Sequence, residues 1–510
     1  MDKPNQDTPR FTELSHFEID ECSVRLLGRD YCMENLVVIL GKVDPKGQEP
    51  VQIGMIRPFR RSVVQEVSRK LGRPANPVQL NAWEIRRAVE EGWGAGEPER
   101  NAALALRPIA GFSFAPETPV PVILDEILGH AIQLGASDIH LEVYEHDVDV
   151  RFRVDGVMRQ ITTHLSHDNV DSALSRLKVI SGLDLAEKRK AQDGRIRAVY
   201  TEPGPEGKTE RGVDFRVSIL PGPFGEDAVL RILDSSSPFL GLEKLGFDAS
   251  ILPVFERLIA NPEGLLLVTG PTGSGKTTTL YSAIHRIRRP EIKILTAEDP
   301  IEYHFEKTNQ KQVSPQMDFA DYARAFLRQN PDVILIGEIR DEETASAAMR
   351  AAQTGHLVLS TLHTADAVRA VSRLHTLGVD LNLIAGSLLG AISQRLVRRL
   401  CPHCRQEAVP DPAEIRRLGL GPDERFFRPA GCEACNGNGY KGRLGIYELF
   451  VPDSEMADMI AEGAPVHTLR EVAIRKGMRT LRDDALTKAR AGMTSLAEVL
   501  RTVPYRILEG

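Results

Sequence analysis

Short apolar runs alternate with helical patterns through the second half of the chain. These near-continuous runs lie at residues 265–268, 292–296, 333–336 and 357–362. Short apolar runs of this kind are typical of strands buried on both faces, and their alternation with helices predicts a mostly parallel sheet. We expect ligands to bind beyond the carboxyl ends of these strands.

A different pattern precedes this region. Residues 147–154 alternate strictly between polar and apolar side chains, which predicts a strand with one buried face. Asp155-Gly156 follows directly and is a strong signal for a hairpin turn. A second, smaller α/β unit is therefore expected upstream of the apolar runs.

The stretch after the first apolar run matches a complete phosphate-binding loop, G-x-x-x-x-G-K-T. The run before it and the helical pattern after it supply the strand, loop and helix that this motif needs. Its glycines let backbone N–H groups point at phosphates, Lys276 would reach the β and γ oxygens, and Thr277 would ligate Mg²⁺. The predicted nucleotide-binding residues are Gly270, Pro271, Thr272, Gly273, Ser274, Gly275, Lys276, Thr277 and Thr278.

Acidic residues follow two of the other predicted strands. Glu298 and Asp299 come after residues 292–296, and Glu338 comes after residues 333–336. Hydrolysis of a γ-phosphate requires charge neutralisation and an oriented water molecule. We expect Glu338 to hold Mg²⁺, through water, and Glu298 to polarise the attacking water.

Two histidines flank the last predicted strand. His363 follows residues 357–362 and would sense the γ-phosphate by donating a hydrogen bond, and His356 is a weaker candidate of the same kind. A buried histidine with satisfied hydrogen bonds is the alternative interpretation, and the sequence leaves both open.

Three arginines of the smaller α/β unit lie in conspicuous settings. Arg195 follows Gln-Asp-Gly, and Arg216 and Arg231 each lie in a predicted strand. One interpretation is that these arginines form a solvated strand face with local ion pairs. The other is that one or more of them reach a nucleotide in a neighbouring subunit.

Two Cys-x-x-Cys pairs form the second strong motif. The pairs are Cys401 with Cys404 and Cys432 with Cys435, and 27 residues separate them. Four thiolates complete a tetrahedral Zn²⁺ site with no open position, so we expect a structural zinc rather than a catalytic one. Zinc ribbons usually separate their pairs by about 15–20 residues, which makes this a looped-out insertion. His403, inside one pair, is not expected to be a ligand.

Composition narrows the possible functions. The 64 Lys and Arg residues against 71 Asp and Glu residues give a net charge of −7, and no long basic tract is visible. This balance, with 5% aromatic residues, does not favour nucleic acid as a partner. The sequence also shows no membrane-spanning stretch or secretory leader, so we expect a cytoplasmic protein that reaches a membrane only through a partner.

The motifs together resemble those of a known family. The phosphate loop and residues 298–303, 337–341 and 354–363 are similar to the Walker A motif, Asp box, Walker B motif and His box of secretion ATPases, in that family's order. The branch that it resembles is the GspE/PilB type of type II secretion and type IV pilus assembly. The resemblance covers residues 121–510. It is weaker over the first hundred residues, where residues 25–28 form only a fragment of the Arg-Leu-Gly-type repeat by which many members bind the platform or a cyclic dinucleotide.

This resemblance implies a homohexameric ring on the cytoplasmic side of an inner-membrane platform protein, in which ATP hydrolysis drives pilin or pseudopilin polymerisation. It implies that Arg195 and Arg216 act at the interface between subunits, and that Arg324, Arg328 and Arg340 lie near the nucleotide. The four-cysteine insertion is typical of assembly motors and is usually missing from retraction motors.

The fold that we expect is α/β, with a RecA-like P-loop ATPase domain at its centre. The expected parts are a small N-terminal docking or regulatory domain (1–105), a linker (106–120), a PAS-like α/β domain (121–237) and the ATPase domain (238–510), with a zinc-binding insertion (398–447) and a helical C-terminal subdomain (450–510). Two alternative functions stay open at this point. They are a RecA-like nucleic-acid translocase and a nucleotide-binding regulatory subunit that does not hydrolyse ATP.

Overall fold

The structure is a computed structural model, and it describes most of the chain between Asp20 and Leu508. The residues within this span that it does not describe are 21–22, 24, 29–30, 33–34, 44–46, 48, 57–60, 81–83, 86–87, 90–102, 110–111, 113–117, 205–206, 235–240 and 422–423. Parts of the expected linker at 106–120 are therefore outside the described residues. The chain divides into two compact units, Met1–Leu104 with Asp171–Arg197, and Ala105–Val170 with Ala198–Gly510.

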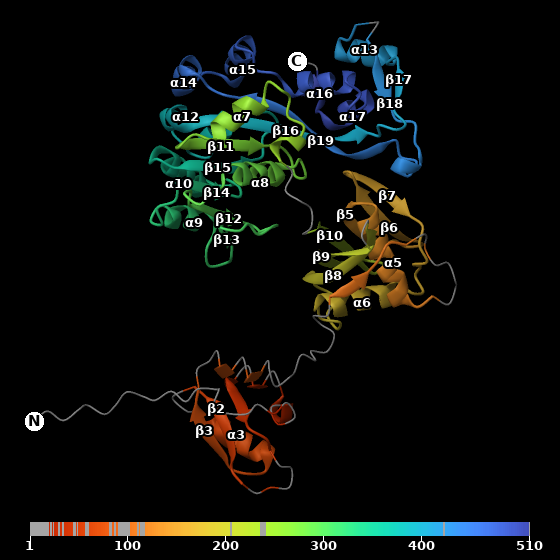
Figure 1. Cartoon of the computed structure of the whole chain (residues 1–510), viewed down its shortest axis with the longest axis vertical. Coiled ribbons are helices and arrows are strands. Elements are labelled where there is room, and N and C mark those ends of the chain that lie inside the picture. The colour runs from red at the N-terminus through yellow and green to blue at the C-terminus, as the bar shows by residue number, and fades with distance from the viewer. Residues whose placement is uncertain are drawn as a thin grey trace, which may run out of the picture. The chain divides into compact units, whose positions relative to one another are not determined.

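The first unit contains a three-stranded sheet (Figure 1). Strand β1 (Val37–Leu40) is antiparallel to β2 (Val51–Met55), which is parallel to β3 (Ala75–Gln79). Helix α3 (Arg61–Leu71) contributes its buried valines to the core of this sheet. The short helix η2 (Arg25–Leu27) and most of α6 (Val170–Ser181) also belong to this unit.

A seven-stranded sheet forms the smaller α/β region. Its order is β4 (Leu104–Leu106), β8 (Gln192–Gly204), β9 (Gly207–Pro221), β10 (Glu226–Asp234), β5 (Ala136–Val143), β6 (Val148–Val154) and β7 (Val157–Ile161), and α5 (Val120–Gln133) precedes β5. The predicted strand at 147–154 is β6, which pairs antiparallel with β7 through the predicted turn. Asp155 and Gly156 adopt φ of 50° and 80° there, the left-handed conformation that this tight turn requires. The prediction of a hairpin is confirmed.

A second seven-stranded sheet contains the four predicted apolar strands. Its order is β13 (Asn309–Gln312), β12 (Ile294–Glu298), β14 (Val333–Ile336), β15 (Leu357–Leu362), β11 (Gly264–Thr269), β16 (Leu388–Leu400) and β19 (Tyr440–Phe450). Neighbouring strands are parallel except for β16 and β19, so the prediction of a mostly parallel sheet is confirmed. The carboxyl ends of β11, β12, β14 and β15 therefore lie at one edge of the sheet.

Helices cover both faces of this sheet (Figure 1). Leu265 and Leu267 of β11 belong to a core with α9 (Phe319–Phe326), α10 (Glu342–Gln353), α11 (Arg369–Thr376) and α12 (Leu381–Ser387). Leu266 and Val268 belong to a second core with η3 (Leu242–Lys244), α7 (Leu252–Ile259) and α8 (Lys276–Ile287). Burial on both faces explains why β11 is apolar at nearly every position.

The C-terminal part adds a small insertion and a set of helices. The insertion contains the antiparallel strands β17 (Gln406–Ala408) and β18 (Phe426–Arg428), α13 (Pro412–Leu418) and η4 (Glu433–Cys435). After it come α14 (Ser454–Ala461), α15 (Val466–Arg475), α16 (Leu481–Arg490), α17 (Leu496–Thr502) and α18 (Tyr505–Leu508). Among the described residues, every helix is too short or too polar to cross a bilayer.

Candidate functional site

The phosphate loop joins β11 to α8. Gly270, Gly273 and Gly275 have φ values of 144°, 75° and 88°, which L side chains rarely adopt. A Cβ atom at Gly270 would also lie 2.5 Å from the carbonyl oxygen of Gln394. The loop can therefore curl at the start of α8 only with glycine at these positions, and the curl leaves backbone N–H groups at a helix N-terminus.

The other predicted loop residues differ in exposure. Pro271, Thr272 and Thr278 are exposed, whereas Ser274 is buried and Thr277 is half-buried in the first turn of α8. The tip of the loop is thus open to a ligand while its base is packed against the sheet.

Lys276 lies within this loop. Its Nζ atom donates hydrogen bonds to the carbonyl oxygens of Gly270 at 3.0 Å and Pro271 at 3.1 Å. Desolvation lowers the pKa of Lys276; the Glu338 carboxylate opposes this shift and the Arg395 charge adds to it. A phosphate entering the loop would meet a cation that has already lost much of its hydration.

A residue that the sequence analysis did not identify holds the loop in place. The Gln394 side chain, 1% exposed, donates from Nε2 to the carbonyl oxygen of Ser274 at 2.6 Å and accepts from Thr279 Oγ1 at 2.8 Å. The Gln394 side chain thus links β16 to the phosphate loop and to α8 by hydrogen bonds. Gln394 is 120 residues away from Ser274 along the chain, and no spacing in the sequence points to it.

Glu338 and His363, both predicted site residues, lie together. Glu338 follows β14, and His363 follows the adjacent strand β15, with His363 Nε2 at 3.5 Å from a Glu338 oxygen. Arg340 forms an ion pair with the other oxygen of Glu338. The His363 side chain is 51% exposed, so the alternative of a buried histidine does not hold. The Glu338 charge also acts on Lys276. Three predicted residues, Lys276, Glu338 and His363, therefore lie at the edge of the sheet that carries the phosphate loop.

Glu298 has a different environment. It ends β12, is 4% exposed, and has hydrogen-bond partners on both carboxylate oxygens. Thr296 Oγ1 at 2.6 Å and Gln310 Nε2 at 3.0 Å donate to one oxygen, and the Tyr281 hydroxyl donates to the other. Burial and the Glu298 charge raise the pKa of Tyr281, which keeps this hydroxyl a donor. These partners leave Glu298 little capacity to bind a water molecule.

A second acid in the same segment has the more open environment. Glu302 is exposed, and its backbone N–H donates to the Tyr281 hydroxyl at 3.3 Å. Desolvation by the surrounding protein raises the pKa of its carboxyl; the Arg216 charge opposes the shift, Glu298 adds to it, and Arg231 opposes it. Sequence reasoning missed Glu302, although it lies within the segment that resembles the Asp box.

His356 lies at the opposite edge of the sheet. It precedes β15, its carbonyl oxygen accepts from the N–H of Gly264 at the start of β11, and its Nδ1 lies 2.9 Å from the carbonyl oxygen of Ala351. Since β11 and β15 are parallel, both starts are at the edge away from the phosphate loop. The expectation that His356 resembles His363 is therefore wrong.

The predicted arginines occupy separate places. Arg216 on β9 and Arg231 on β10 are directly opposite each other in the strand register, and Arg231 Nε lies 3.2 Å from Asp138. The charges of both arginines act on Glu302. Arg195 is an exposed residue of β8, within the first compact unit.

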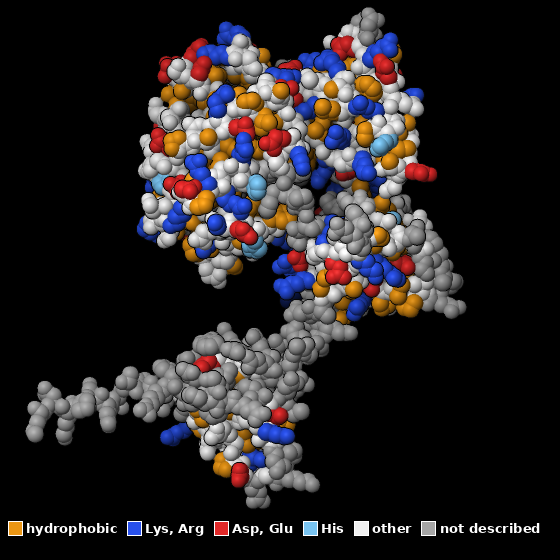
Figure 2. All heavy atoms as spheres, viewed as in Figure 1, with side chains coloured by type: hydrophobic (Ala, Val, Ile, Leu, Met, Phe, Trp, Pro, Cys, Tyr) orange, Lys and Arg blue, Asp and Glu red, His pale blue; other side chains and the backbone are white. Residues whose placement is uncertain are grey.

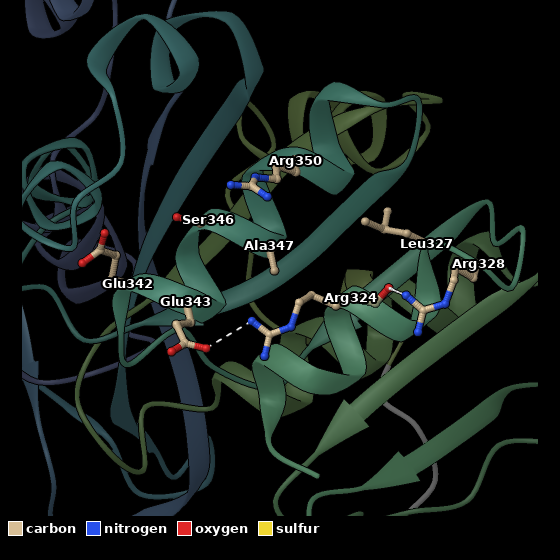
Figure 3. A pocket seen from close by; sticks show the side chains of 8 residues that line it. All are labelled: Arg324, Leu327, Arg328, Glu342, Glu343, Ser346, Ala347 and Arg350. Carbon is tan, nitrogen blue, oxygen red and sulfur yellow. Dashed lines mark hydrogen bonds and ion pairs between the residues drawn. The ribbon is translucent and has the colours of Figure 1, made fainter.

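Helices α9 and α10 border a pocket of about 460 Å³ (Figure 3). Arg324 projects across it and pairs with Glu343 at 3.1 Å and with Asp321 at 2.9 Å. The residues that line this pocket are Arg324, Leu327, Arg328, Glu342, Glu343, Ser346, Ala347 and Arg350. Arg324 and Arg328 thus lie at this pocket, while Arg340 contacts Glu338.

The four predicted metal ligands form one cluster. Their sulfur atoms lie within 4.8 Å of one another, and the pairs Cys401–Cys432, Cys404–Cys435 and Cys432–Cys435 are 3.9, 3.8 and 3.7 Å apart. A Zn–S bond of about 2.3 Å gives a tetrahedral S···S edge of about 3.8 Å, so these distances fit zinc. His403 is exposed and is not part of the cluster.

Backbone groups support the thiolate form of one cysteine of this cluster, Cys435, whereas desolvation and the neighbouring thiols raise the pKa of Cys432 to about 11. The N–H groups of Cys432 at 3.2 Å and Gly439 at 3.1 Å donate to the sulfur of Cys435. Desolvation opposes its ionisation, but these donors, with hydrogen bonds from the Cys432 and Cys404 thiols, outweigh it and lower the pKa of the Cys435 thiol to about 6. Thiolate is the form that binds metal.

Comparisons with known proteins agree with this geometry. The model of the type II/IV secretion system protein family matches residues 115–501, and the model of the MshEN domain matches residues 7–92. Similarity therefore extends into the first hundred residues, where the sequence motifs are weaker.

Three similar proteins illustrate the relationship. The chain is 46% identical to the type IV pilus assembly ATPase PilB of Thermus thermophilus over 76% of this chain and 44% of that protein. It is 39% identical to the type IV pilus assembly ATPase TfpB of Acinetobacter baylyi over 94% of this chain and 83% of that protein. The X-ray structure of the Legionella pneumophila ATPase DotB superposes with a TM-score of 0.55 at 25% identity, over 78% of this chain and 99% of that one. With a family model that spans most of its length and a RecA-like fold around the phosphate loop, the chain belongs to the type II/IV secretion system protein family and is an ATPase.

Proposed function

We propose that this protein forms a homohexameric ring that hydrolyses ATP to power the polymerisation of pilin or pseudopilin. The observation that carries the proposal is the meeting of Lys276, Glu338 and His363 at the phosphate-loop edge of a parallel sheet. Relatives named as pilus assembly ATPases and as type II secretion proteins are equally similar at 46% identity, so the proposal covers both machines. The ring would act in the cytoplasm, on a platform protein of the inner membrane.

Within this proposal the nucleotide binds to the phosphate loop, residues 270–278. Lys276 neutralises charge on its β and γ oxygens, and Thr277, with Glu338 through water, holds Mg²⁺, which when bound withdraws charge from the same oxygens. His363, paired with Glu338, donates to the γ-phosphate. The four cysteines hold a structural Zn²⁺, because their spacing fits its tetrahedral geometry.

The residue that accepts a proton from the attacking water is, in this proposal, Glu302 rather than Glu298. Glu298 is buried and hydrogen-bonded on both oxygens, so its role would be to position Tyr281 and, through it, the backbone of Glu302. Glu302 is exposed and has a raised pKa, which suits a general base.

We further propose that Arg216 and Arg231 serve the nucleotide bound to their own chain. The two arginines are opposite each other on neighbouring strands, and Arg231 is paired with Asp138. Their effect on Glu302 of the same chain supports this placement over the interface role that the resemblance implied for Arg216. Arg195 keeps its proposed place at the interface between subunits.

The surface gives little support to the alternative of a nucleic-acid translocase. On the face drawn in Figure 2, Lys and Arg side chains are interspersed with Asp and Glu over the region of the mostly parallel sheet. A nucleic-acid track needs a continuous basic stripe. The second alternative, a regulatory subunit without turnover, is disfavoured by the complete set of Lys276, Glu338 and His363.

The proposal is tested by ATP turnover measured beside light scattering from the zinc-loaded protein. Wild type should hydrolyse ATP at a rate that rises as hexamers form, Arg216→Ala should lose most of this rate while still assembling, and the same-strand control Lys208→Ala should not. A wild type that binds ATP and never turns over would contradict the motor function.

A mixture of two inactive variants separates the two placements of Arg216. Hexamers mixed from Arg216→Ala and Lys276→Ala subunits should stay inactive if the arginine serves its own chain, because each active site lacks one residue. Recovery of activity in the mixture would place Arg216 at the neighbouring subunit's nucleotide instead.

A further inference from the structure

Arg395 is a buried arginine beside the phosphate loop. It lies on β16, which runs along β11 with Ser393 opposite Thr269, and it follows Gln394, the residue that holds the loop. The Arg395 side chain is 7% exposed. It therefore points into the protein at the carboxyl edge of the sheet.

The hydrogen bonding of this guanidinium group is incomplete. One terminal nitrogen donates to the carbonyl oxygen of Ala365 at 3.2 Å, and Nε is buried without a partner. Over the described part of the chain, no carboxylate comes within ion-pair distance of it. A buried, unpaired charge is strongly unfavourable, so the site calls for an anion that the described chain does not supply.

Other unpartnered polar atoms lie at the same place. The hydroxyl oxygens of Thr269, Ser274 and Ser393 are all buried and, within the described structure, have no hydrogen-bond partner. They belong to the end of β11, the phosphate loop and the strand position opposite Thr269. A region of the fold with this many unsatisfied donors is prepared for a ligand rich in acceptor oxygens.

Cationic side chains lie around Glu338 at this edge. Arg395 lies close enough to Lys276 for its charge to act on that amine, and Glu338, the acid that also acts on Lys276, is shared with Arg340 and His363. Ala365, which Arg395 contacts, is two residues after His363. Arg395 is thus directed toward the side of the loop where the γ-phosphate would lie.

We infer that Arg395 binds the terminal phosphate group of the nucleotide, between the phosphate loop and the segment that follows His363. The inference rests on the proposed ATP site and adds a binding residue to it. The same guanidinium group also donates a hydrogen bond to the carbonyl oxygen of Ala365. Binding of a γ-phosphate to Arg395 would therefore be coupled to the position of residues 363–366.

The test compares the affinities of nucleotides with and without a γ-phosphate. We expect Arg395→Gln to weaken binding of β,γ-imido ATP with Mg²⁺ by about tenfold or more and binding of ADP by less than about twofold, measured by titration calorimetry. Arg399→Gln, an exposed arginine of the same strand, is the matched control and should change neither affinity. Equal losses for the two nucleotides, or no loss for either, would overturn the inference.

A conservative variant covers the case in which Arg395→Gln does not fold. Arg395→Lys keeps the charge but loses the planar donor group, so it should weaken β,γ-imido ATP selectively by a smaller factor. Thermal melting without nucleotide shows whether each variant is folded. If Arg395→Lys discriminates between the two nucleotides no differently from wild type, Arg395 does not bind the terminal phosphate.

These affinities also separate the inference from the proposed function. A wild type that binds β,γ-imido ATP through Arg395 but does not hydrolyse ATP would end the proposed function and leave the inference standing. Normal turnover with unchanged affinities in Arg395→Gln would overturn the inference alone. A wild type that binds neither nucleotide would overturn both.

Discussion

Two of the three arginines of strand β16, Arg395 and Arg398, have contrasting surroundings although they are only three residues apart. Arg398 donates from Nε at 3.0 Å and from a terminal nitrogen at 2.8 Å to Glu498, and its guanidinium lies 4.0 Å from the centre of the Tyr440 ring. Arg395 donates from a terminal nitrogen to the carbonyl oxygen of Ala365 at 3.2 Å, and its Nε has no partner among the described residues. Arg398, on the side of the insertion, has Glu498 as its counterion. Arg395, at the phosphate loop, has no counterion among the described residues and is available to a ligand.

The two regions that β16 connects repeat this difference. In the insertion, the four cysteine sulfurs already lie at zinc spacing, and backbone N–H groups support them. At the phosphate loop, buried hydroxyls and a guanidinium nitrogen have no partner among the described residues. We therefore expect the insertion to act as a structural element and the loop edge as a binding site, so changes in each region should have separate consequences.

The largest expected effect is the loss of zinc from the insertion. Cys404→Ser, or removal of the metal with a chelator, should lower the bound zinc from about one per chain and melt the insertion, because structural zinc sites contribute about 10 kcal/mol or more to folding. Metal analysis and thermal melting would measure this, with His403→Ala as the matched control. Since the regions are separate, the remaining folded protein should keep its affinity for β,γ-imido ATP; full stability without zinc would refute the structural role.

The next effect separates the two acids of the loop edge. Glu302→Gln should lower the rate of hydrolysis by about 10²- to 10⁴-fold, because it removes the proposed general base, whereas the nearby exposed control Glu306→Gln should not. Glu298→Gln should act mainly on stability, by about 1–3 kcal/mol, because it disturbs a buried hydrogen-bond network. Phosphate release and thermal melting would show the two effects. If Glu298→Gln abolishes turnover in a fully stable protein and Glu302→Gln does not, the assignments must be exchanged.

The dependence of the rate on pH gives a smaller, independent test of the same assignment. A general base works only when deprotonated, and the folded-state pKa of Glu302 is raised above that of an ordinary glutamate. The rate should therefore fall as the pH is lowered through this raised pKa, at a higher pH than an ordinary glutamate would give. The residual rate of Glu302→Gln should lack this decline.

Much of the fold was predictable because its signals are local. The apolar strands, the glycines of the loop, the Asp155-Gly156 turn and the paired cysteines each occupy a few consecutive residues, and the structure contains the predicted strands, turn and cysteine cluster. His356 could have been excluded from the sequence alone, because it precedes its strand and so lies at the amino edge of a parallel sheet.

The remaining features depend on contacts between distant parts of the chain. Gln394 and Arg395 meet the loop only because β16 pairs with β11, which no local pattern reveals. The choice between Glu298 and Glu302 depends on Tyr281 and Gln310, which occupy both oxygens of Glu298. Sequence patterns therefore predicted the strands and the loop that carry the proposed site, but the burial and pairing of each side chain required the folded structure.

The most direct test of ATP hydrolysis at this site is a single turnover of prebound ATP with Mg²⁺, followed as released phosphate. Wild type should release about one phosphate per occupied site, and Glu338→Gln should bind ATP but release phosphate at least about a hundredfold more slowly, because it loses the charge that holds Mg²⁺. Equal release by the two proteins, or none by wild type, would contradict the account.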